Sequence, residues 1–145
     1  MGQRQSDPAS CVFCDKLAVD SDSPHDGSDK RPWMYKDDQV AVFHDIRPAA
    51  CIHLLVIPVA HIRNFDSLSR SVHDHQLVSK MVDVGKAALL RLAAGHNVRM
   101  GFHLPPFTSV DHLHLHCFAL PFRHYCASCT WCDNAEYCCP CCCLE

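Results

Sequence analysis

Residues 109–118 read SVDHLHLHCF and carry the pattern that decides the fold. Successive side chains of a β-strand point to opposite faces, so His112, His114 and His116 would share one face. The leucines between them would lie on the other face, and their burial would fix the register. We therefore expect residues 111–120 to form a strand with imidazoles about 6.6 Å apart on one side and core residues on the other.

Two apolar runs that precede this stretch predict further strands. Residues 40–43 and 52–57 are rich in β-branched side chains, and Pro58 stops the second run. A turn at Arg47 and Pro48 separates them. We expect two buried strands that are neighbours in one antiparallel sheet.

The sequence between these strands and the histidines predicts a helix and one more strand. Apolar residues recur every three or four positions within residues 74–94, and Gly95 supplies a stop. The positions of this apolar stripe are Leu77, Met81, Val84, Ala88 and Leu92. A strand over residues 97–102 and a loop at Pro105 and Pro106 follow. This order predicts an α+β fold with one main helix packed on the sheet.

The bulk composition limits the class of protein. The chain has 145 residues, enough for one ordinary domain, and its net charge of −3 leaves no basic surplus for nucleic acid. No apolar run is long enough to span a membrane, and the polar start lacks the apolar centre of a signal peptide. Eight of the twelve cysteines follow residue 125, which argues against a secreted disulfide scaffold. We expect a reducing compartment, the cytoplasm or the nucleus.

Three segments of different character follow one another. The polar residues 1–10 predict disorder, and residues 11–121 hold the expected domain. Within this domain, residues 18–32 form a loop rich in Asp, Ser, Gly and Pro. Residues 11–17 are apolar enough to dock one turn or strand end on the core. Residues 122–145 form a Cys-rich tail without periodicity. We expect this tail to be disordered, with zinc binding and palmitoylation as the alternatives.

A row of three imidazoles suits phosphoryl chemistry. A neutral imidazole nitrogen is a good nucleophile near pH 7, and its neighbours can bind phosphate oxygens or pass protons. Transfer of a nucleotidyl group to His, followed by attack of water, splits one difficult step into two. A transition metal held by the same row is the alternative, although one flat strand does not readily close such a site.

The chain resembles the histidine triad family over about residues 11–120. HLHLHCF at residues 112–118 looks like the family's signature of three histidines that alternate with apolar residues. FHDIRP at residues 43–48 and HLLVIP at residues 53–58 are similar to its nucleotide-binding half, and GFHLPPF at residues 101–107 adds to the likeness. The family implies an antiparallel sheet with a helix on it, a homodimer or higher oligomer, and a bound purine nucleotide of the AMP type.

The resemblance also implies a role for each matching residue. His114 would be the nucleophile, flanked by His112 and His116. His53 would complete the phosphate site, and Ser109 would donate to the phosphate or the leaving group. The base and ribose would lie against Phe43, His44, Asp45 and Ile46, together with His114 and His116. The third histidine, where transferases of this superfamily typically carry Gln, favours a hydrolase.

A second group of residues resembles the structural zinc site of some histidine triad proteins. Cys11 and Cys14 have the spacing that lets two thiolates share one zinc ion, and His61 and His112 are the candidates for the other two ligands. The alternative is that both cysteines are small buried apolar residues. The reaction itself would require no cofactor.

The sequence thus predicts a nucleotide hydrolase that cleaves nucleoside 5'-phosphoramidates or acyl-adenylates through a covalent nucleotidyl-histidine. The alternative is a nucleotide- or protein-binding module with little or no activity. Two departures from the family motivate it: Gly101 stands where Asn is common, and the Cys-rich tail replaces the usual C-terminal residues.

Overall fold

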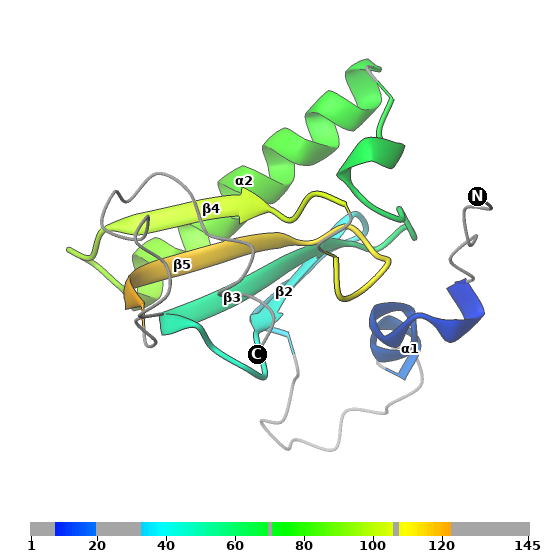
Figure 1. The fold of residues 1–145 in the computed structure, drawn as a ribbon. Coiled ribbons are helices and arrows are strands. Elements are labelled where there is room, and N and C mark those ends of the chain that lie inside the picture. The colour runs from blue at the N-terminus through cyan, green and yellow to red at the C-terminus, as the bar shows by residue number, and fades with distance from the viewer. Residues whose placement is uncertain (1–7, 20–32, 70, 106–107, 123–145) are drawn as a thin grey trace.

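A computed structural model describes residues 8–19, 33–69, 71–105 and 108–122. Residues 1–7 of the segment expected to be disordered (1–10) and residues 123–145 of the Cys-rich tail (122–145) are outside the described residues. The elements in chain order are a short 3-10 helix (Pro8–Ser10), α1 (Val12–Val19), β1 (Tyr35–Lys36), β2 (Val40–His44), β3 (Ala50–Pro58), a second 3-10 helix (Phe65–Ser67), α2 (Val72–Leu92), β4 (Val98–Phe102) and β5 (Leu115–Phe122) (Figure 1).

The strands form one antiparallel sheet in the order β1-β2-β3-β5-β4. The expected neighbours β2 and β3 pair through Val42 and Val56, which confirms the hairpin around Arg47 and Pro48. β5 lies between β3 and β4, so the strand that follows the histidine loop is in the interior of the sheet. With α2 packed on it, this sheet confirms the predicted α+β fold.

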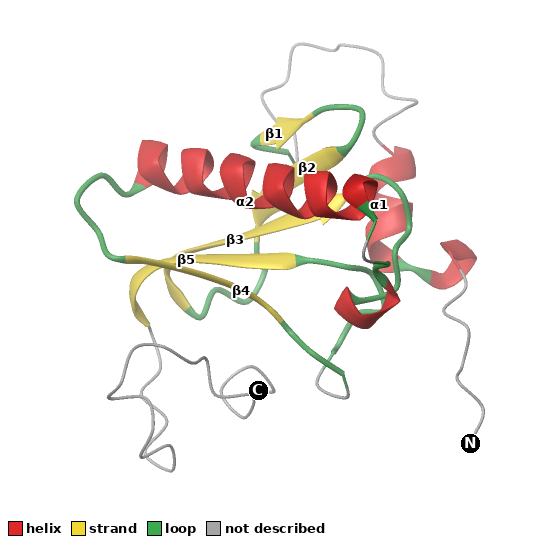
Figure 2. Ribbon diagram, turned by 90° about the horizontal axis from the view of Figure 1, so that it is seen from above, coloured by secondary structure: helices red, strands yellow, loops and turns green. Residues whose placement is uncertain are grey.

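The helix α2 covers one face of the sheet, as Figure 2 shows from above. Ser71 caps its first turn by accepting from the Asp74 backbone N–H. Met81 and Leu89 are fully buried beneath the helix, and each contributes about 1.5–3 kcal/mol by its burial. The predicted stripe is nearly right: Val84 is partly buried against the core as expected, but Gly85 also faces the sheet and Leu92 is exposed.

Gly85 is where α2 comes closest to the sheet. A Cβ atom added at Gly85 would lie 2.6 Å from Cys117 Sγ and 3.1 Å from Val56 Cγ2. Both of these side chains are fully buried, so neither has room to move aside. The missing side chain therefore sets the separation between α2 and the strands that carry the histidines.

The opposite face of the sheet holds a second, smaller cluster. Its buried members are Leu17, Trp33, Ala41, Phe43, Leu55 and Ile57. The helix α1 contributes Leu17 and also places the Lys16 Nζ atom 4.2 Å from the centre of the Phe43 ring. The two clusters alternate along β2 and β3, as expected of strands buried on both faces.

Two local expectations are wrong. Residues 111–114 are not strand, because the Leu113 backbone N–H donates to the Ile62 carbonyl rather than to a neighbouring strand, and pairing with β3 begins at Leu115. Residues 12–17 form neither a single turn nor a strand end but most of α1, and Cys11, just before this helix, and Cys14 within it contact His112 and His61. The alternating leucines Leu113 and Leu115 are both buried against α2, as predicted.

Within the described residues, no helix is both long enough and apolar enough to cross a membrane.

Candidate active site

His114 lies at the last position before β5 and is 6% exposed. Its Nδ1 atom is 2.6 Å from the His112 carbonyl oxygen, which can only accept, so Nδ1 carries the proton. The lone pair is therefore on Nε2. Burial lowers the pKa of His114, which keeps the ring neutral near pH 7. A neutral imidazole with a fixed tautomer is a competent nucleophile.

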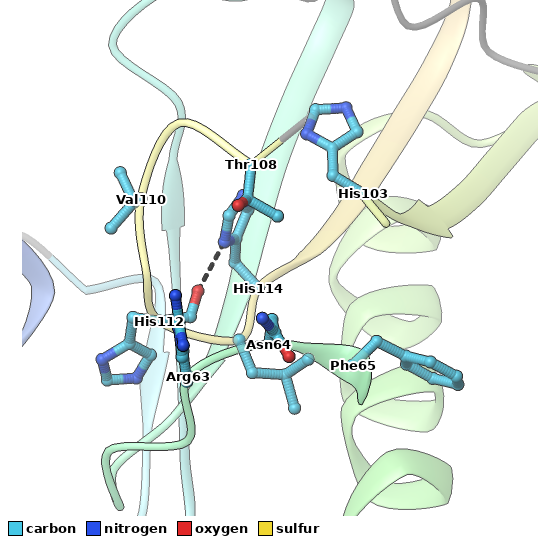
Figure 3. Close-up of a pocket in the computed structure, with 9 residues that line it drawn as sticks. Arg63, Asn64, Phe65, His103, Thr108, Val110, His112 and His114 are labelled. Atoms are coloured by element: carbon cyan, nitrogen blue, oxygen red, sulfur yellow. Dashed lines mark hydrogen bonds between the residues drawn. The ribbon is translucent and has the colours of Figure 1, made fainter. Parts of the chain in front are cut away.

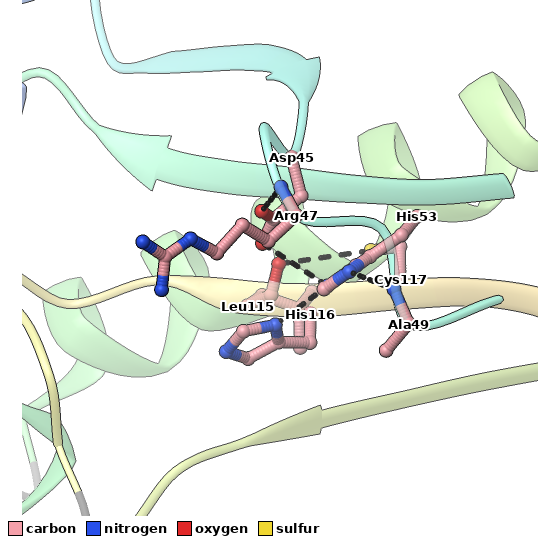
Figure 4. Close-up of polar contacts among 7 residues, drawn as sticks. All are labelled: Asp45, Arg47, Ala49, His53, Leu115, His116 and Cys117. Carbon is pink, nitrogen blue, oxygen red and sulfur yellow. Dashed lines mark hydrogen bonds and ion pairs between the residues drawn. The ribbon is translucent and has the colours of Figure 1, made fainter. Parts of the chain in front are cut away.

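His116 and His53 form a directed pair across β5 and β3 (Figure 4). The Ala49 backbone N–H donates to His53 Nδ1 over 3.2 Å, so the His53 proton is on Nε2. That Nε2 donates to His116 Nδ1 over 2.8 Å. The proton of His116 must then be on its Nε2, which is buried and has no hydrogen-bond partner among the described residues. His116 thus holds an unused donor.

The carboxylate of Asp45 lies next to His53 of this pair. Its Oδ1 accepts from the Arg47 backbone N–H over 2.7 Å, and its Oδ2 lies 3.5 Å from His53 Nε2. The second contact supports the His53 tautomer that donates to His116. Burial lowers the pKa of His53 despite the carboxylate, so the His53 ring stays neutral under ordinary conditions.

A pocket opens beside His114 (Figure 3). His114 and His103 form part of its wall, and His103 comes from the loop after β4. The full lining is Arg63, Asn64, Phe65, His103, Thr108, Val110, His112, Leu113 and His114. His116 is not part of this lining, but one of its ring nitrogens lies within 4.8 Å of ring nitrogens of His103 and His114.

His112 is part of the pocket lining, but its ring does not lie on the same side as those of His114 and His116. It turns instead toward Cys11 and His61. Its fully buried ring packs edge-on against His61, and its Nδ1 lies 3.3 Å from Cys11 Sγ and 3.5 Å from Cys14 Sγ. Its Nε2 donates to the Pro58 carbonyl over 2.9 Å, which leaves the lone pair on Nδ1. The first histidine of the motif therefore belongs to a different cluster from the other two.

That cluster has the donor set of a structural zinc site. Cys14 Sγ lies 3.2 Å from His61 Nδ1, and the four ligand atoms of Cys11, Cys14, His61 and His112 are all within 4.8 Å of one another. Burial and the neighbouring Cys11 raise the pKa of Cys14 to about 11, a cost that a divalent cation would offset. Two sulfurs and two imidazole nitrogens aimed at one centre fit tetrahedral zinc.

The remaining predicted residues surround the site to different degrees. Phe43 is buried, and its ring packs against Phe13 and Trp33. His44 is exposed, Ile46 is 88% exposed, and Ser109 is exposed in the loop before His114. The structure thus brings together His53, Asp45, His114 and His116.

Sequence reasoning missed the pocket residues Arg63, Asn64, His103 and Thr108. The stretch that contains His103 was used only as part of a resemblance, because an isolated loop histidine carries no periodic signal. Arg63 and Asn64 follow β3 at a distance that only the fold reveals. A fourth histidine near an alternating row was the one available hint.

Comparison of the sequence with known proteins identifies relatives of this chain. A family model described as scavenger mRNA decapping enzyme C-term binding matches residues 10–129. The chain is 43% identical over 112 residues to the bifunctional adenosine 5'-phosphosulfate phosphorylase/adenylylsulfatase HINT4 of Arabidopsis thaliana, covering 77% of this chain and 71% of that protein. It is 38% identical over 120 residues to the adenosine 5'-monophosphoramidase HINT3 of Xenopus tropicalis, covering 81% and 72%.

The fold is shared with solved structures. A HIT family hydrolase from Clostridium thermocellum superposes with a TM-score of 0.62 at 24% identity, covering 80% of this chain and 95% of that one. The antiparallel sheet with α2 packed on it is the fold that this HIT family hydrolase shares with the chain. The chain belongs to the histidine triad family.

Proposed function

We propose that the chain hydrolyses nucleoside 5'-phosphoramidates or acyl-adenylates through a nucleotidyl group held on His114. The observation that carries this proposal is the bond from His114 Nδ1 to the His112 carbonyl, which leaves Nε2 as the nucleophilic atom. The names of the relatives, one an adenosine 5'-monophosphoramidase and one an adenylylsulfatase, support an adenylate-type substrate.

In the first step, His114 Nε2 attacks the α-phosphorus, and the P–N bond to the leaving amine, or the P–O bond to the leaving acid, breaks. An amine needs a proton as it leaves. The Nε2–H of His116 has no hydrogen-bond partner among the described residues, so we assign to it a hydrogen bond to the leaving nitrogen. It is the only N–H of a neutral ring, so water in the pocket supplies the proton that the amine takes. In an acyl-adenylate the leaving carboxylate needs no proton, and His116 keeps the same role of hydrogen-bond donor.

In the second step, water attacks the same phosphorus and the bond between phosphorus and His114 Nε2 breaks. For either leaving group, the proton that the attacking water loses passes to solvent, and the Nε2–H of His116 stays in place. The products are the nucleoside monophosphate and the neutral imidazole of His114. Both rings return to their starting tautomers, which the His112 carbonyl and His53 define.

The experiment uses a fluorogenic adenosine phosphoramidate with the wild-type chain and with His114→Ala. We expect the variant to lose at least about 10³-fold in kcat, since the covalent route is gone. Brief mixing with substrate, followed by acid-free mass spectrometry, should find an added adenylyl group on the wild type alone. Equal rates for the two proteins would refute the assignment of His114. Tight AMP binding without turnover by the wild type would favour the binding module.

We also propose that Cys11, Cys14, His61 and His112 hold a structural zinc ion. The donor set and the shared centre support this. Four protein ligands would fill a tetrahedral site, so the ion would hold α1 against the histidine loop and leave the chemistry to His114.

A further inference from the structure

His103 is a polar group at the centre of the site that the proposed reaction does not yet use. Its ring centre lies 4.2 Å from that of His116 and 6.0 Å from that of His114. The ring is half-buried in the pocket wall. Its Nδ1 is completely buried and has no hydrogen-bond partner among the described residues.

An unpartnered buried imidazole nitrogen is costly. Leaving such a group without a hydrogen bond costs about 1–3 kcal/mol, so native structures rarely keep one without a reason. The space next to His103 is the pocket that the nucleophile also lines, and a bound substrate is what would occupy it. The missing partner is therefore expected on the substrate.

The chemistry of the neighbours selects the kind of group. His116 Nε2 is already a donor, because its Nδ1 accepts from His53. A metal ion shared by His103, His114 and His116 would need lone pairs on all three rings and would disrupt that tautomer. Burial, with His114 next to it, lowers the pKa of His103, so its ring is neutral and carries one N–H, which the unpartnered Nδ1 can hold. Two unused donors around one nucleophile suit an anion.

We propose that His103 is a catalytic residue whose Nδ1–H binds a non-bridging oxygen of the reacting phosphoryl group. The bond strengthens as the phosphorus becomes five-coordinate and negative charge gathers on that oxygen. No proton leaves His103: His116 serves the leaving group and His103 serves the oxygen that stays. This division of roles rests on the proposed hydrolase function.

The test compares His103→Ala and His103→Asn with the wild type and with Leu104→Ala. An Asn side-chain amide places its N–H where the histidine has Nδ1–H, so it can keep the bond. Leu104 is the next residue in the same loop, and its side chain is 55% exposed, so it controls for disturbance of the loop. The substrates are adenosine phosphoramidates of several amines that differ in leaving-group pKa, and AMP affinity is measured for each protein.

We expect His103→Ala to lower kcat about 100-fold, the typical effect of losing one preorganised donor, by the same factor for every amine. His103→Asn should recover at least about tenfold of this loss, while Leu104→Ala stays near the wild type. AMP affinity should change by less than about threefold, because the bond strengthens only in the transition state.

Several results would overturn the proposal. A defect that grows with the pKa of the leaving amine would make His103 a proton donor rather than an oxygen ligand. A loss confined to KM and AMP affinity, an Asn variant as slow as the Ala variant, or an equal loss in Leu104→Ala would also exclude it. If the wild type turns over no phosphoramidate, both this proposal and the proposed function fail. If it is active and depends on His114, but His103→Ala is unimpaired, only this inference fails.

Discussion

His53 Nε2 donates to His116 Nδ1 over 2.8 Å, and this one bond decides which nitrogen of His116 can serve the substrate. Without it, the proton of His116 could move to Nδ1 and leave no donor at Nε2. We expect His53→Ala to lower kcat about 10- to 100-fold, as is usual for a partner that orients a reacting group. His53→Gln, which keeps an N–H near the same place, should recover most of the rate. Steady-state kinetics on both variants decides this, and equal losses would count against tautomer control.

The buried histidines predict that the protein is less stable in acid. Burial lowers the pKa values of His53, His103 and His116, so these rings stay neutral in the folded state at pH values where the unfolded chain protonates them. Unfolding then takes up protons below the ordinary pKa of about 6.5, and the free energy of unfolding falls as pH falls. Each such proton contributes about 1.4 kcal/mol per pH unit.

Urea unfolding from pH 8 to pH 5, with zinc in excess, measures this slope. His116→Gln should reduce the slope between pH 6 and pH 5 by about one proton. His73→Gln is the matched control, because His73 is 83% exposed and is not one of the buried histidines. A wild type equally stable at pH 8 and pH 5 would contradict the prediction.

The cysteine cluster predicts a zinc-dependent melting temperature. In the full-length chain, replacing both Cys11 and Cys14 by serine should remove about one zinc ion per chain relative to the wild type. The melting temperature should fall by at least about 5 °C, because the free energy of metal binding contributes to folding. Cys51→Ser controls for the loss of a thiol elsewhere, since Cys51 is exposed and outside the cluster. Unchanged zinc content and melting temperature in the double variant would end the proposal.

The close contact at Gly85 predicts an unusual response to alanine. Alanine in a helix normally gains about 0.5–1 kcal/mol over glycine. Here the new Cβ would lie 2.6 Å from Cys117 Sγ, and overpacking should cost about 1–3 kcal/mol instead. Adding Cys117→Ala to Gly85→Ala should remove part of the clash, and a double-mutant cycle on unfolding free energies would reveal the coupling. Additive effects of the two substitutions would show that the contact is relieved in another way.

Most of the fold could be predicted from sequence patterns, whereas only part of the candidate site could. The strands β2 and β3 and the helix α2 were predictable because β-branched apolar runs and apolar spacings of three and four leave few alternatives. The start of β5 was not, because the alternation of His112 to His116 continues through residues whose backbone bonds go to Ile62 and not to a strand. The predicted dimer and location in the cell stay predictions.

Local sequence also could not assign the three histidines to separate tasks. His112 shares a pattern with His114 and His116, yet its ring turns to Cys11 and Cys14, which lie about a hundred positions earlier. Such long-range neighbours depend on how α1 docks. His103 and the directed bond between His53 and His116 depend on packing in the same way. The residue types indicated the kind of chemistry, but only the fold shows which histidine belongs to which cluster.

The packing of α2 against β5 decides whether sulfur or nitrogen can act as a nucleophile on this strand. Two adjacent residues of β5 carry potential nucleophiles on opposite faces, the imidazole of His116 and the thiol of Cys117. Cys117 is fully covered where Gly85 approaches it, and burial raises its pKa to about 12. A thiol in that place can neither ionise at neutral pH nor meet a phosphorus atom or an oxidant. By covering the sulfur, the helix leaves nitrogen as the only nucleophilic element that this strand and the residue before it present to a substrate.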